Sequence, residues 1–474
     1  PFISSGTAPA RPRERMNSPL EIRKVRLRGL GGPAVCGVPN TRASAAGAIV
    51  TQSLTFPTIA AQPSDPPSET SWIADASRTG GYNPRRRISR LSSGDFNRSG
   101  GGLGALAERM VPHGFGRLAR ACVAAAMAAT LAGCAARLAP GDAQALGDVL
   151  FAPPTRAEMC AVEAEWARRD TRSHDARVEW RDEGRGGRTI VLSHTVDGLR
   201  HYGGVRIPPG AEGSRLPVLV ITHGGDKGTS GYNFVRSGPI AEGWIQVLPS
   251  YRSERLTMRA LRRYRSQGRP SPWDRDVDDA MALLSTALAQ VPEADTARIA
   301  VLGRSRGGGV ALLMAIRDPR VKGVVDYNGP TDFYLPEVRR LADRALRSRI
   351  PRLPGAGYLA DSVLFALRDG RTTVERARSE LLRRSPVYFA HRLPPTQIHH
   401  GTRDDEVPIV HSQRLIGSLT GIGRTAPLWE MVTYPGGGHR PHTLTGARQR
   451  VDDWLQRVVA SGAAPPRITP RPGC

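Results

Sequence analysis

The sequence has 474 residues, of which 39% are hydrophobic and 5% aromatic, and its formal net charge is +24. This length allows one large core or two domains. The charge suggests a nucleic-acid partner, but all but three of the 67 basic residues are arginines, aromatic residues are scarce and no nucleic-acid motif is present. An arginine bias of this kind is typical of GC-rich coding, so we expect no nucleic-acid partner.

The cysteines give no sign of a metal or redox centre. Five are present, and they form no Cys-x-x-Cys pair, no metal-ligand spacing with histidine and no paired framework. We therefore expect no metal site and no bound cofactor.

The first part of the chain has the composition of a disordered segment followed by an export signal. Residues 1–109 are rich in Pro, Ser, Gly and Arg without sustained apolar periodicity. In residues 110–134, Arg117 and Arg120 precede the apolar run 121–130, which is too short to remain in a bilayer as a spanning helix. Because signal peptides lie at the amino end of a protein, we expect translation to begin at Met110 and residues 1–109 not to be made.

The signal ends in Leu-Ala-Gly-Cys at residues 131–134, which resembles the lipobox of bacterial lipoproteins. The resemblance implies cleavage before Cys134 and acylation of that cysteine. Ala135, where aspartate would be the retention signal, resembles the outer-membrane sorting pattern. The expected location is therefore a lipid anchor in a bacterial outer membrane, facing the periplasm; the alternative is an alanine-rich core helix.

The mature chain is expected to contain a tether and helix in residues 135–175, one domain in residues 176–462 and a tail in residues 463–474. Predicted helices alternate with predicted strands, which favours a mostly parallel, doubly wound α/β sheet with helices on both faces. Residues 333–389 interrupt this alternation and are predicted to form a helical cap above the carboxyl edge of the sheet. The predicted strands are 178–180, 189–192, 204–207, 216–222, 244–248, 299–302, 321–327, 396–400 and 428–434, and the predicted helices 156–169, 274–290, 310–316, 411–419 and 443–460.

A Gly-x-Ser-x-Gly pattern stands between a predicted strand and a predicted helix. Gly303 and Gly307 flank Ser305, and such a strand–turn–helix context is typical of a nucleophile elbow. The glycines leave room for a strained turn, and the serine hydroxyl then stands above the amino end of the helix, where N–H groups can stabilise an oxyanion. By itself, in a glycine-rich chain, the pattern fits a turn before a core helix equally well.

Three further motifs follow predicted strands in the same way. They are Thr-His-Gly-Gly at residues 222–225, the acidic loop at 400–408 and the glycine-rich loop at 434–439. With the elbow, they resemble the α/β-hydrolase fold, and more narrowly the catalytic domain of prolyl oligopeptidase and dienelactone-hydrolase-like serine hydrolases. The resemblance covers about residues 215–460.

The resemblance implies a catalytic triad. Ser305 would be the nucleophile, His439 its general base and Asp404 the acid that orients the imidazole, in the chain order of α/β-hydrolases. Asp405 remains an alternative acid, and His442 an alternative base.

The family pattern also implies an oxyanion hole formed by the backbone N–H groups of Arg306 and Gly225. In this family, histidines such as His223 and His400 brace loops by hydrogen bonds, and we expect that role here. His399 is expected to point into the sheet.

Arginines are concentrated in residues 251–269 and in the predicted cap. One interpretation is a set of solvated helix faces in an arginine-rich protein. The other is an electropositive mouth that selects acidic substrates or rests on anionic lipid.

These features predict a serine hydrolase that cleaves an ester, or less readily a peptide, through an acyl-serine intermediate. A prolyl-oligopeptidase-like peptidase is the first alternative, although about 80 residues between Cys134 and the His-Gly-Gly strand are too few for a propeller with about 40 to 45 residues per blade. Dienelactone hydrolase has a cysteine nucleophile where this chain has Ser305, so its substrate is not implied. A catalytically inactive binding lipoprotein on the same fold is the alternative from another class. The expected partners are an acyl substrate and, through the lipid anchor, a membrane.

Overall fold

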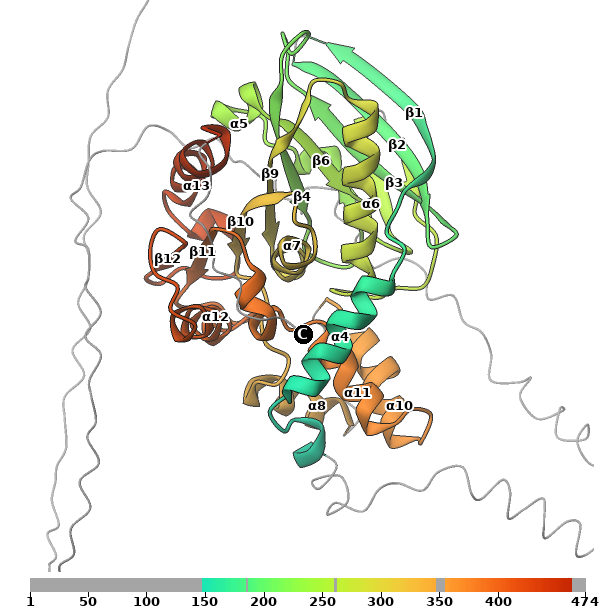
Figure 1. Cartoon of the computed structure of the whole chain (residues 1–474), viewed down its shortest axis with the longest axis vertical. Coiled ribbons are helices and arrows are strands. Elements are labelled where there is room, and N and C mark those ends of the chain that lie inside the picture. Colours follow the sequence, from blue (N-terminus) through green and yellow to red (C-terminus); the bar gives the residue numbers. More distant parts are fainter. Residues whose placement is uncertain (1–146, 185, 260–261, 347–353, 463–474) are drawn as a thin grey trace, which may run out of the picture. The chain divides into compact units, whose positions relative to one another are not determined.

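Figure 1 shows the computed structural model, which describes residues 147–184, 186–259, 262–346 and 354–462. All of them belong to one compact unit. The predicted disordered segment, signal peptide, lipidation site at Cys134 and C-terminal tail lie outside the described residues.

A nine-stranded sheet forms the centre, in the order β1-β2-β3-β6-β4-β9-β10-β11-β12. The first three strands pair antiparallel, and β3 also pairs antiparallel with β6, whereas the six strands from β6 to β12 are parallel. This confirms the predicted mostly parallel sheet. The strands are β1 (His174–Gly184), β2 (Gly187–Val196), β3 (Leu199–Ile207), β4 (Leu216–Thr222), β6 (Ile245–Pro249), β9 (Ala294–Arg304), β10 (Val321–Tyr327), β11 (Thr396–Gly401) and β12 (Trp429–Tyr434).

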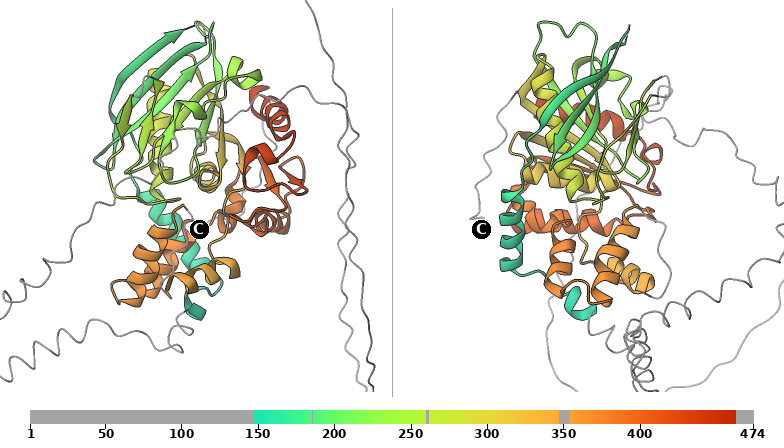
Figure 2. Two further views of the ribbon diagram at one scale, coloured as in Figure 1. Left: turned by 180° about the vertical axis from the view of Figure 1, so that it is seen from behind. Right: turned by 90° about the vertical axis from the view of Figure 1, so that its right-hand side faces the viewer.

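Helices cover both faces of the sheet, as predicted (Figure 2). In β4, Val218 and Val220 pack into the core on one face, whereas Leu219 and Ile221 pack into the core on the other. This alternation of buried apolar residues is what a strand buried on both faces requires. The first face carries α6 (Arg275–Gln290), α7 (Arg306–Arg317) and α12 (Val410–Gly421), and the second carries α5 (Gly238–Gly243), α13 (Ala447–Leu455) and the π-helical turn η6 (Gln456–Ala460).

The insertion between β10 and β11 is helical, as expected of the cap. It consists of short elements: α8 (Pro336–Leu346), α9 (Ala356–Leu359), η3 (Ala360–Leu364), α10 (Phe365–Arg368), α11 (Val374–Leu382) and η4 (Pro386–Arg392). Helix α4 (Arg156–Arg168), which precedes the sheet, packs beside α11 (Figure 1). Arg378 of α11 binds Glu158 at 2.5 Å and donates to the carbonyl groups of Val149 and Ala152 at 2.8 Å each. The segment before α4 is thereby held against the cap.

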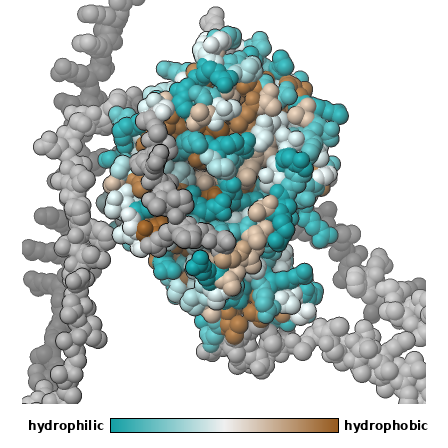
Figure 3. All heavy atoms as spheres, in the orientation of Figure 1, coloured by the Kyte–Doolittle hydropathy of each residue, from teal (hydrophilic) through white to brown (hydrophobic). Residues whose placement is uncertain are grey.

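The arginine-rich segment adopts a structure that the sequence did not predict. Two short strands, β7 (Arg255–Thr257) and β8 (Arg263–Arg265), join β5 (Thr229–Ser230) in a second, three-stranded sheet. Arg252, just before β7, is buried and forms an ion pair with Asp279 of α6 at 3.1 Å. On the face seen in Figure 3, hydrophilic side chains predominate, with apolar patches between them.

Cys160 of α4 is disulfide-bonded, so the prediction of no paired cysteines is wrong for this residue. Spacing alone does not specify which cysteines pair. Among the described residues, no helix is both long and apolar enough to span a membrane.

A buried histidine pair is expected to destabilise the protein in mild acid. His194 and His201 face each other across β2 and β3, and no ring nitrogen of either makes a hydrogen bond within the described structure. Burial lowers the pKa of His194 to about 4 and that of His201 to about 3. In the unfolded chain both titrate near 6.5, so below that pH the unfolded state binds more protons than the folded state. The free energy of unfolding, measured by urea denaturation, should therefore fall by several kcal/mol between about pH 6.5 and pH 4.

A variant with both histidines replaced by glutamine should show a shallower pH dependence over that interval. An unchanged slope would assign the acid sensitivity to other groups.

Candidate active site

Ser305 occupies a strained turn between β9 and α7. Its backbone angles are φ 56° and ψ −127°, a conformation that costs a non-glycine residue of the order of 1 to 3 kcal/mol. The turn is held by a hydrogen bond from Ser305 N to the carbonyl of Tyr327 on the neighbouring strand (2.8 Å). A bond of the same length joins Gly308 N to the carbonyl of Ser305. Ser305 therefore has the geometry of the predicted elbow.

The flanking glycines are required by the close approach of backbone to backbone. A Cβ atom on Gly303 would lie 2.0 Å from the carbonyl oxygen of Gly307, and one on Gly307 would lie 2.1 Å from that of Thr222. Neither position admits a side chain without displacement of the turn.

His439 and Asp404 are brought together by the loops after β12 and β11. Nδ1 of His439 lies 2.8 Å from Oδ2 of Asp404, and Oδ1 of Asp404 accepts hydrogen bonds from the backbone N–H groups of Glu406 and Val407 at 3.0 and 2.8 Å. A carboxylate on Nδ1 fixes the proton there and leaves Nε2 as the basic atom. The alternative acid, Asp405, is exposed.

The alternative base also lies away from this pair, since His442 is exposed in the turn η5 (Pro441–Thr443).

The side chain of Asn328 donates to the carbonyl groups of Gly438 and His439 at 3.3 and 3.0 Å, which holds the histidine loop in place. Nothing in the sequence motifs indicated this contact, because Asn328 follows β10, a strand without a motif of its own.

The other histidines of the motifs brace the loops, as the resemblance implied. Nε2 of His400 is 2.8 Å from the carbonyl of Val407, and its Nδ1 is 2.6 Å from the hydroxyl of Ser412. His399 is buried in the sheet, with Nδ1 2.7 Å from the hydroxyl of Tyr434.

The predicted oxyanion donors lie on the two segments next to Ser305. Arg306 is the first residue of α7, so its N–H has no acceptor within the helix. Gly225 has φ 77° and open space around it, and the position of a Cβ on Gly224 would lie 3.1 Å from Cβ of Ser305. The loop after β4 therefore passes directly beside the elbow.

The side chain of Arg306, to which the sequence assigned no role, links this loop to α6. It is 2% exposed, and its guanidinium group binds Asp276 at 2.9 Å, Glu254 at 2.5 Å and the carbonyl oxygen of Gly225 at 2.9 Å. Asp276 also accepts the N–H of Trp273 at 3.0 Å. One buried cation thus fixes both the glycine loop and the backbone of a tryptophan.

His223 adjoins the same network. Its Nδ1 lies 3.0 Å from the carbonyl of Gly224, and its ring stacks on Tyr251 with the centroids 4.1 Å apart. Burial, reinforced by the charge of Arg306, lowers the pKa of His223 to about 4, so it is neutral near pH 7 and suited to a structural role.

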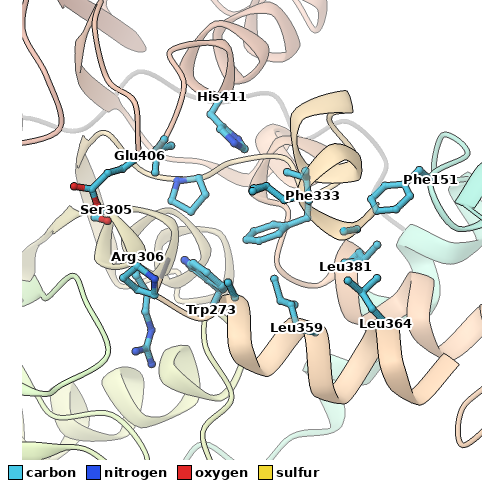
Figure 4. A pocket seen from close by; sticks show the side chains of 18 residues that line it. Phe151, Trp273, Ser305, Arg306, Phe333, Leu359, Leu364, Leu381, Glu406 and His411 are labelled. Carbon is cyan, nitrogen blue, oxygen red and sulfur yellow. The ribbon is translucent and has the colours of Figure 1, made fainter. Parts of the chain in front are cut away.

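A pocket of about 120 Å³ opens at Ser305 (Figure 4). Its polar lining residues are Ser305, Arg306, Glu406 and His411. No described arginine of the segment 251–269 or of the cap lines it. The apolar lining comes mainly from Phe151, Trp273, Pro330, Phe333, Val338, Leu341, Ala342, Pro354, Ala356, Leu359, Ala360, Leu364, Leu381 and Val407.

Glu406 connects the histidine to the pocket, a position that sequence reasoning missed. Its carboxylate lies 3.7 Å from Nε2 of His439, and it lines the pocket together with Ser305. The part of the chain that the structure describes contains no group of histidine, cysteine and acidic residues suited to a metal ion.

Comparisons with known proteins agree with the fold. Residues 284–442, about one third of the chain, match the model of the BAAT / acyl-CoA thioester hydrolase C-terminal family, and this range includes Ser305, Asp404 and His439. No curated protein sequence matches significantly.

Several solved structures are similar at low identity. Acetyl xylan esterase 1 from a Thermoanaerobacterium species is 19% identical, with a TM-score of 0.47, and the match covers 66% of this chain and 98% of that one. The acylaminoacyl peptidase of Pyrococcus horikoshii is 18% identical, with a TM-score of 0.42, and the match covers 61% of this chain and 42% of that one. A puromycin-hydrolyzing peptidase of Mycobacterium tuberculosis is 20% identical, with a TM-score of 0.42, and the match covers 60% of this chain and 46% of that one. The matches therefore span less than half of either peptidase, and none of these similarities indicates a substrate.

The order and direction of the sheet strands, with the loops that follow β4, β9, β11 and β12 gathered at one edge, are those of the α/β-hydrolase fold. Within that fold, residues 284–442 are similar to the BAAT / acyl-CoA thioester hydrolase C-terminal family.

Proposed function

We propose that this protein is a serine hydrolase that cleaves esters of apolar acyl groups through a covalent acyl-Ser305 intermediate. The observation that carries the proposal is the strained serine at the end of β9, next to the loop of Gly225 and opening into an apolar pocket that also contains Glu406, the neighbour of the His439–Asp404 pair.

In the proposed mechanism, the hydroxyl oxygen of Ser305 attacks the acyl carbon while its proton passes to Nε2 of His439. Asp404 stabilises the resulting imidazolium by its bond to Nδ1. The backbone N–H groups of Arg306 and Gly225 donate to the oxyanion of the tetrahedral intermediate. As the bond from the acyl carbon to the alcohol oxygen breaks, the imidazolium gives its proton to the leaving alcohol. Water then attacks the acyl carbon with His439 again as base, the bond to Oγ of Ser305 breaks, and the imidazolium returns the proton to Oγ as the carboxylic acid leaves.

The pocket supports an apolar acyl group rather than an acidic one. Its walls are aliphatic and aromatic side chains, and the arginine-rich segment forms a separate small sheet. The match to an acyl thioester hydrolase model is compatible with the same preference, and thioesters enter the proposal as a second class of leaving group. Because no described arginine of residues 251–269 or of the cap lines the pocket, the pocket lining does not support the hypothesis that these arginines select acidic substrates.

Export and lipid anchoring remain part of the proposal. A disulfide at Cys160 favours an oxidising compartment, because disulfides rarely persist in the reducing cytosol. An N-terminal peptide that begins at a doubly or triply acylated Cys134 is the signature to seek by mass spectrometry of the membrane fraction.

The test combines an active-site probe with a substrate series, both on the full-length protein. A fluorophosphonate probe should label Ser305, identified by peptide mapping, and p-nitrophenyl esters should show kcat/KM rising with acyl length from acetate until the pocket is filled. A proline-containing peptide series is included as the peptidase alternative. Failure of the probe to label Ser305 in folded protein, together with no ester hydrolysis, would favour the inactive binding protein.

A further inference from the structure

His411 is buried at the wall of the pocket. It is the second residue of α12 and only 4% exposed, and Figure 4 shows it on the lining, between Glu406 near the Ser305 end and Phe333. The residue has no role in the triad or in the proposed oxyanion hole.

The backbone fixes which nitrogen of this ring carries a proton. Nδ1 lies 3.2 Å from the N–H of Thr331 and 3.3 Å from that of Asp332, both of which donate to it. Because two N–H groups point at Nδ1, that atom must hold the lone pair, so the proton is on Nε2. A flipped ring would place a carbon opposite both donors and leave them unpaired, which disfavours it.

Nε2–H is a donor without an acceptor. No hydrogen bond joins it to any protein group among the described residues. Burial lowers the pKa of His411 to about 4, so near neutral pH the ring is uncharged and keeps this single donor. The Nε2 atom itself is not fully buried, so an oxygen of a ligand in the pocket can accept this hydrogen bond.

The surroundings make this donor selective. The other polar residues of the described lining, Ser305, Arg306 and Glu406, lie together at one end of the pocket in Figure 4. The guanidinium group of Arg306 is turned away and taken up by Asp276 and Glu254. Trp273 also lines the pocket, and its indole Nε1–H makes no hydrogen bond, but that nitrogen is fully buried. Along the apolar part of the pocket, therefore, His411 offers the accessible side-chain donor among the described residues.

We propose that His411 is a specificity residue whose Nε2–H binds a ketone or hydroxyl oxygen on the acyl chain of the substrate. The preferred substrate is then an oxo- or hydroxyacyl ester (or thioester), with its oxygen at the one chain position that lies opposite His411. This inference rests on the proposed function, since it places the acyl group in the pocket at Ser305.

The test compares p-nitrophenyl octanoate with analogues in which one ketone is moved from the third to the sixth carbon. Each rate is divided by the rate of alkaline hydrolysis, which removes the intrinsic reactivity of the ester. For the wild type, one analogue should exceed octanoate in kcat/KM by about 10- to 100-fold, while its neighbours do not.

Two variants separate the donor from the structural role of the ring. In His411→Asn the side-chain oxygen can still accept from Thr331 and Asp332, but the amide nitrogen then lies near the position of Cδ2 and its N–H groups fall short of the position of Nε2. The preference should therefore disappear while octanoate is still hydrolysed. In His411→Gln the longer amide can place an N–H near the position of Nε2, and part of the preference should return.

The outcomes distinguish this inference from the function on which it depends. Hydrolysis of octanoate with no preference for any oxo analogue, or a preference that persists in His411→Asn, would overturn the role of His411 alone. No hydrolysis of any ester, with no fluorophosphonate labelling of Ser305, would overturn both.

Discussion

Replacing Ser305 with alanine is expected to lower kcat by a factor of about 10⁴ to 10⁶, with the fold unchanged. The methyl group cannot form the acyl intermediate, and only the oxyanion donors and the bound geometry would remain to assist water. Alanine also fits the turn, because it is no larger than the serine that now adopts φ 56°. The measurement is steady-state hydrolysis of the best p-nitrophenyl ester, with circular dichroism to show that the variant is folded.

Because the three proposed residues act as a unit, their losses should not add. His439→Ala should cost about as much as Ser305→Ala, and the double variant little more. Asp404→Asn should cost about 10⁴-fold in kcat, because the amide can no longer hold the proton on Nδ1. The matched control is Asp405→Asn, which changes the same charge one residue further on at an exposed site and should retain activity within a few-fold. Equal losses in the two variants would refute the assigned pair.

The elbow could be predicted from sequence because its causes are local. The turn requires glycine on both sides of Ser305, since any Cβ there collides with neighbouring backbone, and this leaves a readable Gly-x-Ser-x-Gly. The order of the motifs along the chain then predicted which strand ends meet. The pairing of His439 with Asp404 rather than Asp405 follows from the loop geometry, which buries only the first of the two carboxylates.

Element boundaries were harder to predict where tertiary packing overrides local preference. Helix α7 begins at Arg306, although glycines at 307–309 are poor helix formers and favoured a later start. Close packing requires glycine here, because the first turn of the helix lies directly against other backbone: a Cβ on Gly307 would be 2.1 Å from the carbonyl oxygen of Thr222. Strand β1 extends well beyond the predicted three residues because a partly exposed edge strand carries charged residues that hide its pattern.

The lining of the pocket could not be predicted, because it comes from separate segments that meet only in the folded chain. Phe151 precedes the sheet, Leu364 belongs to the cap and His411 to a helix on one face of the sheet. None of these positions carries a motif. Likewise, a buried role for the side chain of Arg306 is not visible in an arginine-rich sequence, where solvated arginines are the rule.

Arg306→Met is expected to lower both stability and activity. The substitution leaves Asp276 and Glu254 buried without their cation, and removing one partner of a buried ion pair costs about 3 to 5 kcal/mol. It also frees the carbonyl oxygen of Gly225 from its hydrogen bond to Arg306. Asp276, which accepts the backbone N–H of Trp273, is then no longer held by the guanidinium group, so the position of Trp273 is less firmly fixed. We therefore expect the free energy of unfolding to fall by that amount in urea denaturation. In the fraction that remains folded, kcat should fall by about 10- to 100-fold, because a proposed oxyanion donor is no longer held in place.

The matched control lies on the other side of the nucleophile. Arg304→Met changes the same residue type in the same turn, but the side chain of Arg304 makes no hydrogen bond or ion pair within the described structure, so its stability should remain within about 1 kcal/mol of the wild type. A triple variant, Arg306→Met with Asp276→Asn and Glu254→Gln, removes the unpaired charges and should regain part of the lost stability without regaining activity. If Arg306→Met and Arg304→Met prove equally stable, the buried network does not support the glycine loop. If the triple variant regains kcat as well as stability, the loss in the single variant came from the stranded carboxylates and not from the freed carbonyl of Gly225.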